Sequence, residues 1–309
     1  EKRNPLVERR MAKRARKFDR ALEDLGNIVE LEHVNVTIPN QEVATQFYVT
    51  ALGLTRDPYL ITGVTNMWIN VGRSQFHLPT NPPQVLRGCV GLIMPDLKSL
   101  VKRLNSARTP LARTKFDFKI SKSKKLVEVT CPWGNKYRCH EADEEHTPIS
   151  LGMGYVQFDV QIGTAKKIAQ FYRLAFGTRA FVEKWDGATS ARVSAGHQQE
   201  LIFRESKKKL VKFDGHHIQI YVADFSAPHK WLREHGLITE ESNRHQYRFL
   251  DIVDVDDGSP IFSIEHEVRS MTHPLYGRPK VNRNPDQTNR SFAHGHETIS
   301  WAAPMTGSS

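Results

Sequence analysis

Two neighbouring stretches, Val156-Gln157-Phe158-Asp159-Val160 and Phe171-Tyr172-Arg173-Leu174-Ala175-Phe176-Gly177, decide the fold because both occur twice. Their earlier copies are His33-Val34-Asn35-Val36-Thr37 and Phe47-Tyr48-Val49-Thr50-Ala51-Leu52-Gly53. A slide of 124 residues lays Phe47 on Phe171, and the same slide lays His33 on Gln157 without a gap. Such self-similarity indicates a duplicated unit.

Each copy opens a β-α-β-β-β module. Apolar and polar residues alternate from His33 to Ile38, Pro39-Asn40 precedes a predicted helix of about 41–51, and Gly53 ends it. Strands follow at 65–71 and 74–78 around the turn Gly72-Arg73. The same order predicts three further modules, beginning with strands at 89–94, 154–162 and 216–222 and continuing with helices at 96–106, 164–176 and 226–235.

Segments of different character flank and join the modules. Residues 1–20 carry nine Lys/Arg and three acidic residues, so most of the formal charge of +10 is local. This argues against nucleic-acid binding by the modules. Residues 1–28 are expected to form a basic amphipathic helix that docks on the chain itself or on a subunit partner, with an acidic partner, membrane headgroups or a targeting remnant as alternatives. The predicted domains are 29–142 and 148–270, with a linker at 142–148 and an extended tail at 271–309.

Composition favours a soluble protein in a reducing compartment, such as cytoplasm or an organelle matrix or stroma. No apolar run approaches the roughly 20 residues that span a bilayer. The three cysteines, Cys89, Cys131 and Cys139, have no C-x-x-C spacing, so neither a disulfide framework nor a zinc ribbon is indicated.

The four modules, with F-Y and a later glycine after the first strand, resemble the vicinal oxygen chelate superfamily over about residues 29–268. This family includes glyoxalase I, extradiol dioxygenases and bleomycin-resistance proteins. The resemblance implies an α+β fold in which pairs of modules form cup-shaped eight-stranded sheets. It also implies metal ligands that project inward from the first and last strands of each module.

Carried onto the second half, the resemblance implies a metal site of Gln157, Glu200, His217 and Glu265. One imidazole and three oxygen donors suit a divalent Zn, Ni, Co, Fe or Mn ion. His216 beside His217 leaves a register ambiguity of one residue. Strand alternation places Glu265 and Glu267 on one face and His266 on the other, so either Glu265 or His266 enters the cup.

The first half departs from this pattern. His33 and His77 fit the first two ligand positions, but Cys89 or Val90 occupies the third position and Arg138 the fourth. Arginine has no lone pair for a metal. The first half is therefore expected to have lost metal chemistry and its cup to be structural or anion-binding, with a rearranged metal site as the alternative. The tail contains His273, His294 and His296; the pair His294 and His296 is expected to be solvated, with completion of a site in a neighbouring chain as the alternative.

These residues favour a metal-dependent, glyoxalase-like lyase or isomerase that acts on a small oxygen-rich substrate. Glu200 or Glu265 would shuttle a proton. The alternative is a non-catalytic binding or assembly subunit, which would use residues 1–26 and the tail to hold a homodimer or a larger complex. An extradiol dioxygenase is less favoured, since such enzymes usually supply two histidines and the predicted set has one.

Overall fold

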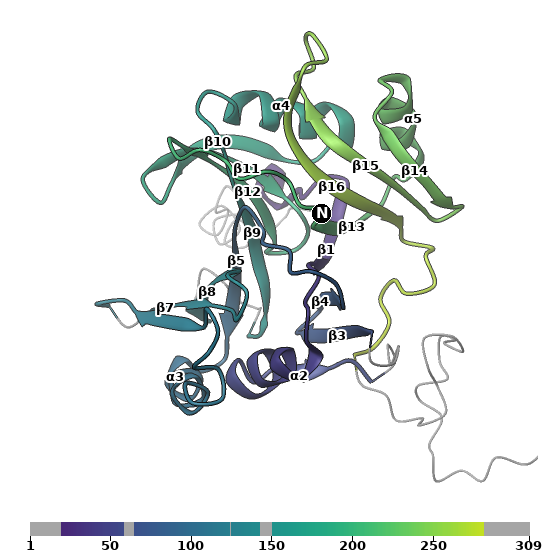
Figure 1. The fold of residues 1–309 in the computed structure, drawn as a ribbon. Coiled ribbons are helices and arrows are strands. Elements are labelled where there is room, and N and C mark those ends of the chain that lie inside the picture. Colours follow the sequence, from purple (N-terminus) through teal and green to yellow (C-terminus); the bar gives the residue numbers. More distant parts are fainter. Residues whose placement is uncertain (1–19, 59–64, 124, 143–149, 281–309) are drawn as a thin grey trace, which may run out of the picture.

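A computed structural model describes residues 20–58, 65–123, 125–142 and 150–280, and their strands form two eight-stranded sheets (Figure 1). The chain thus has the predicted α+β architecture. Most of the predicted N-terminal helix and linker, and the tail after Lys280, lie outside the described residues. Of the first segment, Arg20–Glu23 forms one 3-10 turn. None of the described helices is long and apolar enough to span a bilayer.

The four predicted modules are present, with a short additional strand, β2, that the sequence pattern did not indicate. The first module consists of β1 (Ile28–Asn35), α2 (Gln41–Ala44) continued by the π-helix η2 (Thr45–Ala51), β2 (Thr55–Arg56), β3 (Asn66–Val71) and β4 (Ser74–Pro79). The second consists of β5 (Gly88–Met94), α3 (Leu97–Ser106), β6 (Asp117–Ile120), β7 (Leu126–Thr130) and β8 (Lys136–Glu141).

The second half repeats this order. The third module contains β9 (Gly152–Gln161), α4 (Ala165–Phe176), β10 (Ala180–Trp185), β11 (Ala188–Ser194) and β12 (Glu200–Ser206). The fourth contains β13 (His217–Val222), α5 (Ser226–Glu234), β14 (Ile238–Asn243), β15 (Gln246–Val253) and β16 (Pro260–Ser270). Gly177, the last residue of the repeated stretch, caps α4 in the left-handed conformation at φ 58°.

The modules pair in an order that differs from the predicted domains. The first sheet joins the first and fourth modules in the order β14-β15-β16-β13-β1-β4-β3-β2. The second sheet joins the second and third modules in the order β10-β11-β12-β9-β5-β8-β7-β6. Residues 29–142 and 148–270 therefore each contribute one module to each sheet. Both sheets are completed within one chain.

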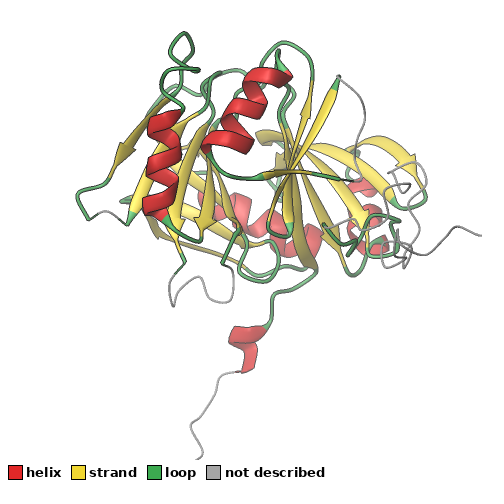
Figure 2. Cartoon of the chain, turned by 90° about the horizontal axis from the view of Figure 1, so that it is seen from below, coloured by secondary structure: helices red, strands yellow, loops and turns green. Residues whose placement is uncertain are grey.

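Consecutive modules pack against each other across the two sheets. The tyrosine of each repeated F-Y pair makes this connection: the hydroxyl of Tyr48 lies 2.7 Å from that of Tyr137, and that of Tyr172 lies 2.6 Å from Nε2 of His266. Gln199 of the third module also exchanges hydrogen bonds with the backbone of Leu31 in the first. These buried contacts satisfy polar groups that would otherwise be costly between the sheets. Figure 2 shows the two strand layers and their helices.

After β16, residues 271–280 cross to the first module and end beside its outer strands, as the yellow end of the ribbon in Figure 1 shows. Arg278 is almost completely buried there, and its Nη2 lies 2.9 Å from Oδ2 of Asp57 and 3.2 Å from Oε1 of Gln75. Tyr276 packs against Tyr221 of β13 with ring centroids 4.8 Å apart. This part of the predicted tail is an ordered strap that joins the fourth module to the first.

We expect Arg278→Met to destabilise the protein by about 3–5 kcal/mol, because it removes the buried cation that lies 2.9 Å from the buried Asp57 carboxylate. Urea unfolding followed by tryptophan fluorescence measures the change. The double variant Arg278→Met/Asp57→Leu should recover much of the loss, and the exposed Arg113→Met provides the matched control. Equal unfolding midpoints for wild type and Arg278→Met would contradict this role of the strap.

Acid should weaken the packing between α4 and β16. Burial lowers the pKa of His266 to about 3, although its Nδ1 lies 2.8 Å from the carbonyl of Ile264. An unfolded histidine titrates near 6.5, so the unfolded chain binds the extra proton between about pH 3 and 6.5 and stability falls as pH falls through this window. Between pH 7 and 5 this one group contributes a loss of up to about 2 kcal/mol.

The comparison of wild type with His266→Gln at pH 7 and pH 5 isolates this contribution. The variant should be less stable at pH 7, because it loses the contact to Tyr172, but it should lose less stability on acidification. A variant that loses as much stability between the two pH values as wild type would show that His266 is not the group responsible.

Candidate metal centre

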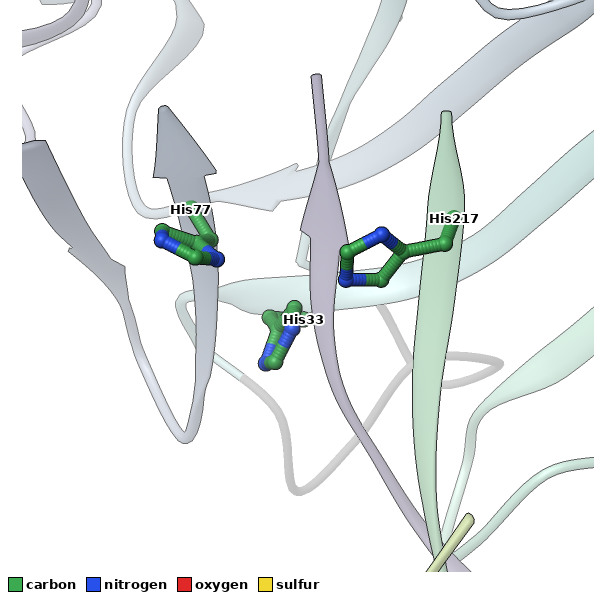
Figure 3. A group of neighbouring side chains, drawn as sticks. All are labelled: His33, His77 and His217. Carbon is green, nitrogen blue, oxygen red and sulfur yellow. The ribbon is translucent and has the colours of Figure 1, made fainter. Parts of the chain in front are cut away.

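Three histidines meet on the first sheet: His33 of β1, His77 of β4 and His217 of β13 (Figure 3). One nitrogen from each of the three rings can be chosen so that all three lie within 4.8 Å of one another. The strand register produces this meeting. Asn35 pairs with both His77 and His217, whereas His33 pairs with Gln219, so alternate residues of the three central strands share one face.

In each of the three imidazoles, Nδ1 has a polar neighbour. Nδ1 of His33 lies 3.1 Å from Oε2 of Glu32, Nδ1 of His217 lies 3.3 Å from Oε2 of Glu265, and Nδ1 of His77 lies 2.7 Å from Nδ2 of Asn35. A half-turn of the Asn35 amide puts its oxygen at this position, where it accepts a hydrogen bond from Nδ1 and leaves Nε2 of His77 unprotonated. Nε2 of each ring is buried and has no hydrogen-bond partner among the described residues. Histidines that bind metals typically hold one ring nitrogen with a neighbouring polar group and offer the other to the ion.

Glu267 of β16 brings a carboxylate to the same place. Its Oε2 lies 3.6 Å from the unpartnered Nε2 of His217, and its side chain is 4% exposed. The strand register shows that Glu267 is the equivalent of His77. Gln219, two residues after His217, pairs with Glu267, and Asn35, two residues after His33, pairs with His77. The four positions are therefore the first-strand and last-strand positions of the two modules in this sheet.

Arginines hold this carboxylate in its ionised form. Arg248 of β15 pairs with both Glu265 and Glu267, and Nη2 of Arg269 lies 2.6 Å from Oε1 of Glu267. Burial alone would raise the pKa of Glu267, but Arg269, the nearby histidines and Arg248 together bring it below its ordinary value. The carboxylate therefore carries a negative charge at neutral pH.

A β-bulge supplies the second buried carboxylate. Between Leu31 and His33 the register of β1 against β13 shifts, so Glu32 has no opposite residue. A bulge changes the direction of the side chain next to it. Glu32 consequently contacts His33, and its Oε2 lies 3.1 Å from Nη1 of Arg269. Arg269 thus lies between Glu32 and Glu267.

Two of the three histidines are kept neutral by their surroundings. Burial lowers the pKa of His33 despite its contact with Glu32. Burial and the neighbouring His33 and His217 lower the pKa of His77 to about 2. A neutral imidazole is the form that ligates a metal, so the cluster has unprotonated nitrogens available at neutral pH.

The structure divides the four residues that the sequence predicted as ligands. His217 and Glu265 belong to the first sheet, where Glu265 contacts Nδ1 of His217, on the far side of the ring from the cluster. Gln157 belongs to the second sheet, where its Oε1 accepts a hydrogen bond from Nε1 of Trp185. Glu200 also lies in the second sheet and pairs with Arg192. The four side chains therefore do not surround one point.

Two sequence ambiguities are resolved at the same place. His217 faces the cluster, whereas His216 is fully buried and its Nδ1 lies 2.6 Å from Oδ1 of Asp214. Glu265 and Glu267 lie on the cluster face of β16, and His266 points to α4, as strand alternation predicted. Of the three tail histidines, only His273 is among the described residues, and it is half-buried against Tyr221.

The sequence pattern did not predict this cluster, because the prediction placed consecutive modules in one sheet, whereas the first sheet joins the first and fourth modules. His33 and His77 were assigned to a half without metal chemistry, yet the structure places both beside His217. The residue types at the ligand positions could have revealed the cluster. The first and fourth modules supply three histidines and Glu267 at the ligand positions, whereas the second and third supply Cys89, Arg138, Gln157 and Arg204. Only the first combination is a set of metal donors.

No family model and no curated protein sequence matches the chain. Solved structures do match. A putative dioxygenase from Bacillus subtilis is 16% identical, with 80% of this chain and 87% of that chain covered and a TM-score of 0.53. Glyoxalase I from Zea mays is 14% identical, with 79% and 92% covered and a TM-score of 0.58. Together with the four βαβββ modules, these likenesses show that the chain has the fold of the vicinal oxygen chelate superfamily.

Proposed function

We propose that the chain is a metal-dependent enzyme in which His33, His77, His217 and Glu267 hold one divalent ion. Two observations support this proposal: one nitrogen of each of the three rings lies within 4.8 Å of a nitrogen of the other two, and the buried Nε2 atoms of all three have no hydrogen-bond partner among the described residues. Unpartnered buried polar atoms are rare, and each costs about 1–3 kcal/mol. Three of them together are best explained by a shared ligand.

The donor set indicates the kind of metal. Three imidazoles and one carboxylate suit Fe, Co, Ni or Zn, whereas Mg and Ca prefer sites made of oxygen atoms. The described residues place no cysteine thiolate at the cluster, which argues against a structural zinc site. An ion held by these four residues would bind a substrate through oxygen atoms at its remaining coordination positions.

The chain supplies acid–base and binding groups next to the cluster. A divalent ion bound there would act as a Lewis acid towards a substrate oxygen and stabilise developing negative charge. Glu265 is only partly buried, and the hydrogen bond from His217 and the charge of Arg248 lower its pKa despite its burial, so it is an ionised base beside the site. Glu265 would accept a proton from the substrate carbon next to a carbonyl and return it to a neighbouring atom.

Gln219 would orient the substrate. It pairs with both His33 and Glu267, so it shares the cluster face, and its side chain is fully buried. Neither its amide nitrogen nor its amide oxygen has a partner among the described residues. Trp68 forms a wall of the site, since its ring stacks on His77 with centroids 3.8 Å apart. These groups favour a small substrate with several oxygens, and a lyase or isomerase reaction.

Oxygen activation is the second candidate. The preference for glyoxalase-like chemistry over a dioxygenase rested on a predicted set with one histidine, whereas the cluster contains three. Two histidines and one carboxylate are the ligands of many non-haem Fe(II) oxygenases. The cluster offers such a set in His33, His217 and Glu267. This observation favours testing iron as well as redox-inactive ions.

The metal proposal predicts stoichiometric binding of one Co, Ni, Zn or Fe(II) ion per chain to purified protein. His33→Ala, His77→Ala and His217→Ala should each weaken binding more than about 100-fold, because loss of even an outer contact typically costs about 10–100-fold. Isothermal titration and metal analysis after dialysis measure this. The matched controls are Gln157→Ala and Glu200→Ala in the second sheet, which should bind normally.

A wild-type protein that binds no ion, or a loss of binding in Gln157→Ala with none in His33→Ala, would overturn the assignment. Visible absorption of the cobalt-loaded protein adds a direct check of the ligands. Its d–d bands should shift on His77→Ala and stay unchanged on Glu200→Ala, since only the former removes a nitrogen donor.

The two glutamates on β16 should separate binding from proton transfer. We expect Glu267→Gln to weaken metal binding at least about tenfold, because Glu267 approaches the open Nε2 of His217. Glu265→Gln should leave binding within about threefold, because the amide oxygen that replaces the carboxylate still accepts a hydrogen bond from Nδ1 of His217. The metal-loaded protein in deuterated water should catalyse deuterium incorporation next to the carbonyl of small 2-hydroxycarbonyl compounds, and Glu265→Gln should lose this exchange by about 100-fold or more.

Exchange that survives in Glu265→Gln would exclude this residue as the base. Oxygen uptake by the Fe(II)-loaded protein with aromatic diols, in the absence of carbon–hydrogen exchange, would favour the dioxygenase instead.

A further inference from the structure

Residues of the second sheet line a cavity of about 400 Å³. We propose that it binds a small oxyanion, a carboxylate or a phosphate, between Arg138 of β8 and Arg204 of β12. These arginines occupy the last-strand positions that His77 and Glu267 occupy in the first sheet, since Arg138 pairs with Gly91 and Arg204 with Asp159. The two sheets thus present different chemistry at the same four positions.

The arginines converge on one point. Nη1 of Arg138 lies 3.4 Å from Oδ2 of Asp186, and Nη2 of Arg204 lies 3.4 Å from the backbone oxygen of the same residue. Asp186 is at the tip of the hairpin between β10 and β11 and has a positive φ of 49°. Both guanidinium groups therefore reach the space at this hairpin tip from opposite modules.

Neither arginine is fully satisfied. Nε of Arg138 and Nε of Arg204 are buried and have no hydrogen-bond partner among the described residues. The remaining carboxylates are distant for charged pairs, with Glu128 at 3.9 Å from Arg138 and Asp159 at 3.6 Å from Arg204. Charge-assisted pairs of arginine and carboxylate usually lie at about 2.7–2.9 Å and are often bidentate. A bound oxyanion would complete these bonds.

The floor of the cavity is neutral and able to donate hydrogen bonds. Gln157 and Cys89 pair across the seam between β5 and β9 and line the cavity. Burial raises the pKa of the Cys89 thiol to about 12, so no thiolate opposes an anion there. The amide nitrogen of Gln157 lies 3.5 Å from Asp159, a weak contact that a ligand could replace.

The charges of the side chains that line the cavity indicate which kind of ligand it binds. Its lining combines five basic and four acidic side chains: Lys119, Lys136, Arg138, Arg204 and Lys208 with Asp117, Glu128, Asp159 and Asp186. This near balance is unlike the strongly positive grooves that bind nucleic acid. It favours a small anion, which would displace the half-exposed Asp186 from the two arginines.

Titration of the full chain with sodium phosphate and, separately, with sodium malonate at constant ionic strength tests the proposal. The Nε–H signals of Arg138 and Arg204 in nitrogen-15 spectra report binding directly. We expect saturable shifts of both signals with at least one anion. Arg138→Gln and Arg204→Gln should each weaken binding about tenfold or more, and Asp186→Asn should tighten it, because the internal competitor is removed. The exposed Arg113→Gln is the matched control.

Saturation by phosphate alone or by malonate alone would identify which oxyanion the cavity takes. Shifts that never saturate, weakening by Arg113→Gln as large as that by Arg138→Gln, or binding unchanged or weakened in Asp186→Asn would overturn the proposal. The last variant keeps both arginines and decides the matter even if Arg138→Gln does not fold. The titration is repeated with EDTA, since binding that disappears with EDTA would belong to a metal in the first sheet.

Discussion

The antiparallel seam between β1 and β13 is the constraint on which the site depends. It joins the first module to the fourth, and its register sets Gln219 opposite His33 and His217 opposite Asn35. The parallel neighbours β4 and β16 then bring His77 and Glu267 to the same level. Because side chains alternate along a strand, a slip of one residue in this seam would turn the ligands of one module away from those of the other. The buried apolar residues on the other face, such as Val34 and Ile218, hold this register.

Charge balance explains how one face can bury so many ionisable groups. Glu32 and Glu267 are both nearly inaccessible, and an unpaired buried carboxylate would be expensive. Arg269 pairs with both of them, and its Nε donates to Oε1 of Gln246. Arg248 adds a second cation beside Glu267. Polar networks of this kind are stable only when each member is satisfied. The three open histidine nitrogens and the amide of Gln219 are among the groups on this face that the described residues leave without a hydrogen bond.

The sequence predicted the elements well and their assembly less well. Helix and strand positions follow from local residue patterns, so the repeat around Phe47 and Phe171 and the alternation of Glu265, His266 and Glu267 were informative. Module pairing depends instead on long-range packing between four similar units, which no local pattern specifies. The bulge at Glu32 and the strap at Arg278 were equally invisible, because each is defined by a partner far along the chain: Arg269 for Glu32 and Asp57 for Arg278.

The division of the four modules between two sheets explains why the four predicted ligands do not lie together. Gln157 occupies in the second sheet the position that His33 occupies in the first, whereas Glu200 lies four residues before the equivalent position, Arg204. The fold thus holds two sets of four equivalent positions in separate sheets. A substitution at one set leaves the seam of the other intact, since β1–β13 and β5–β9 share no strand. Donors for a cation can therefore persist in one sheet while arginines replace them in the other, with the backbone of both unchanged.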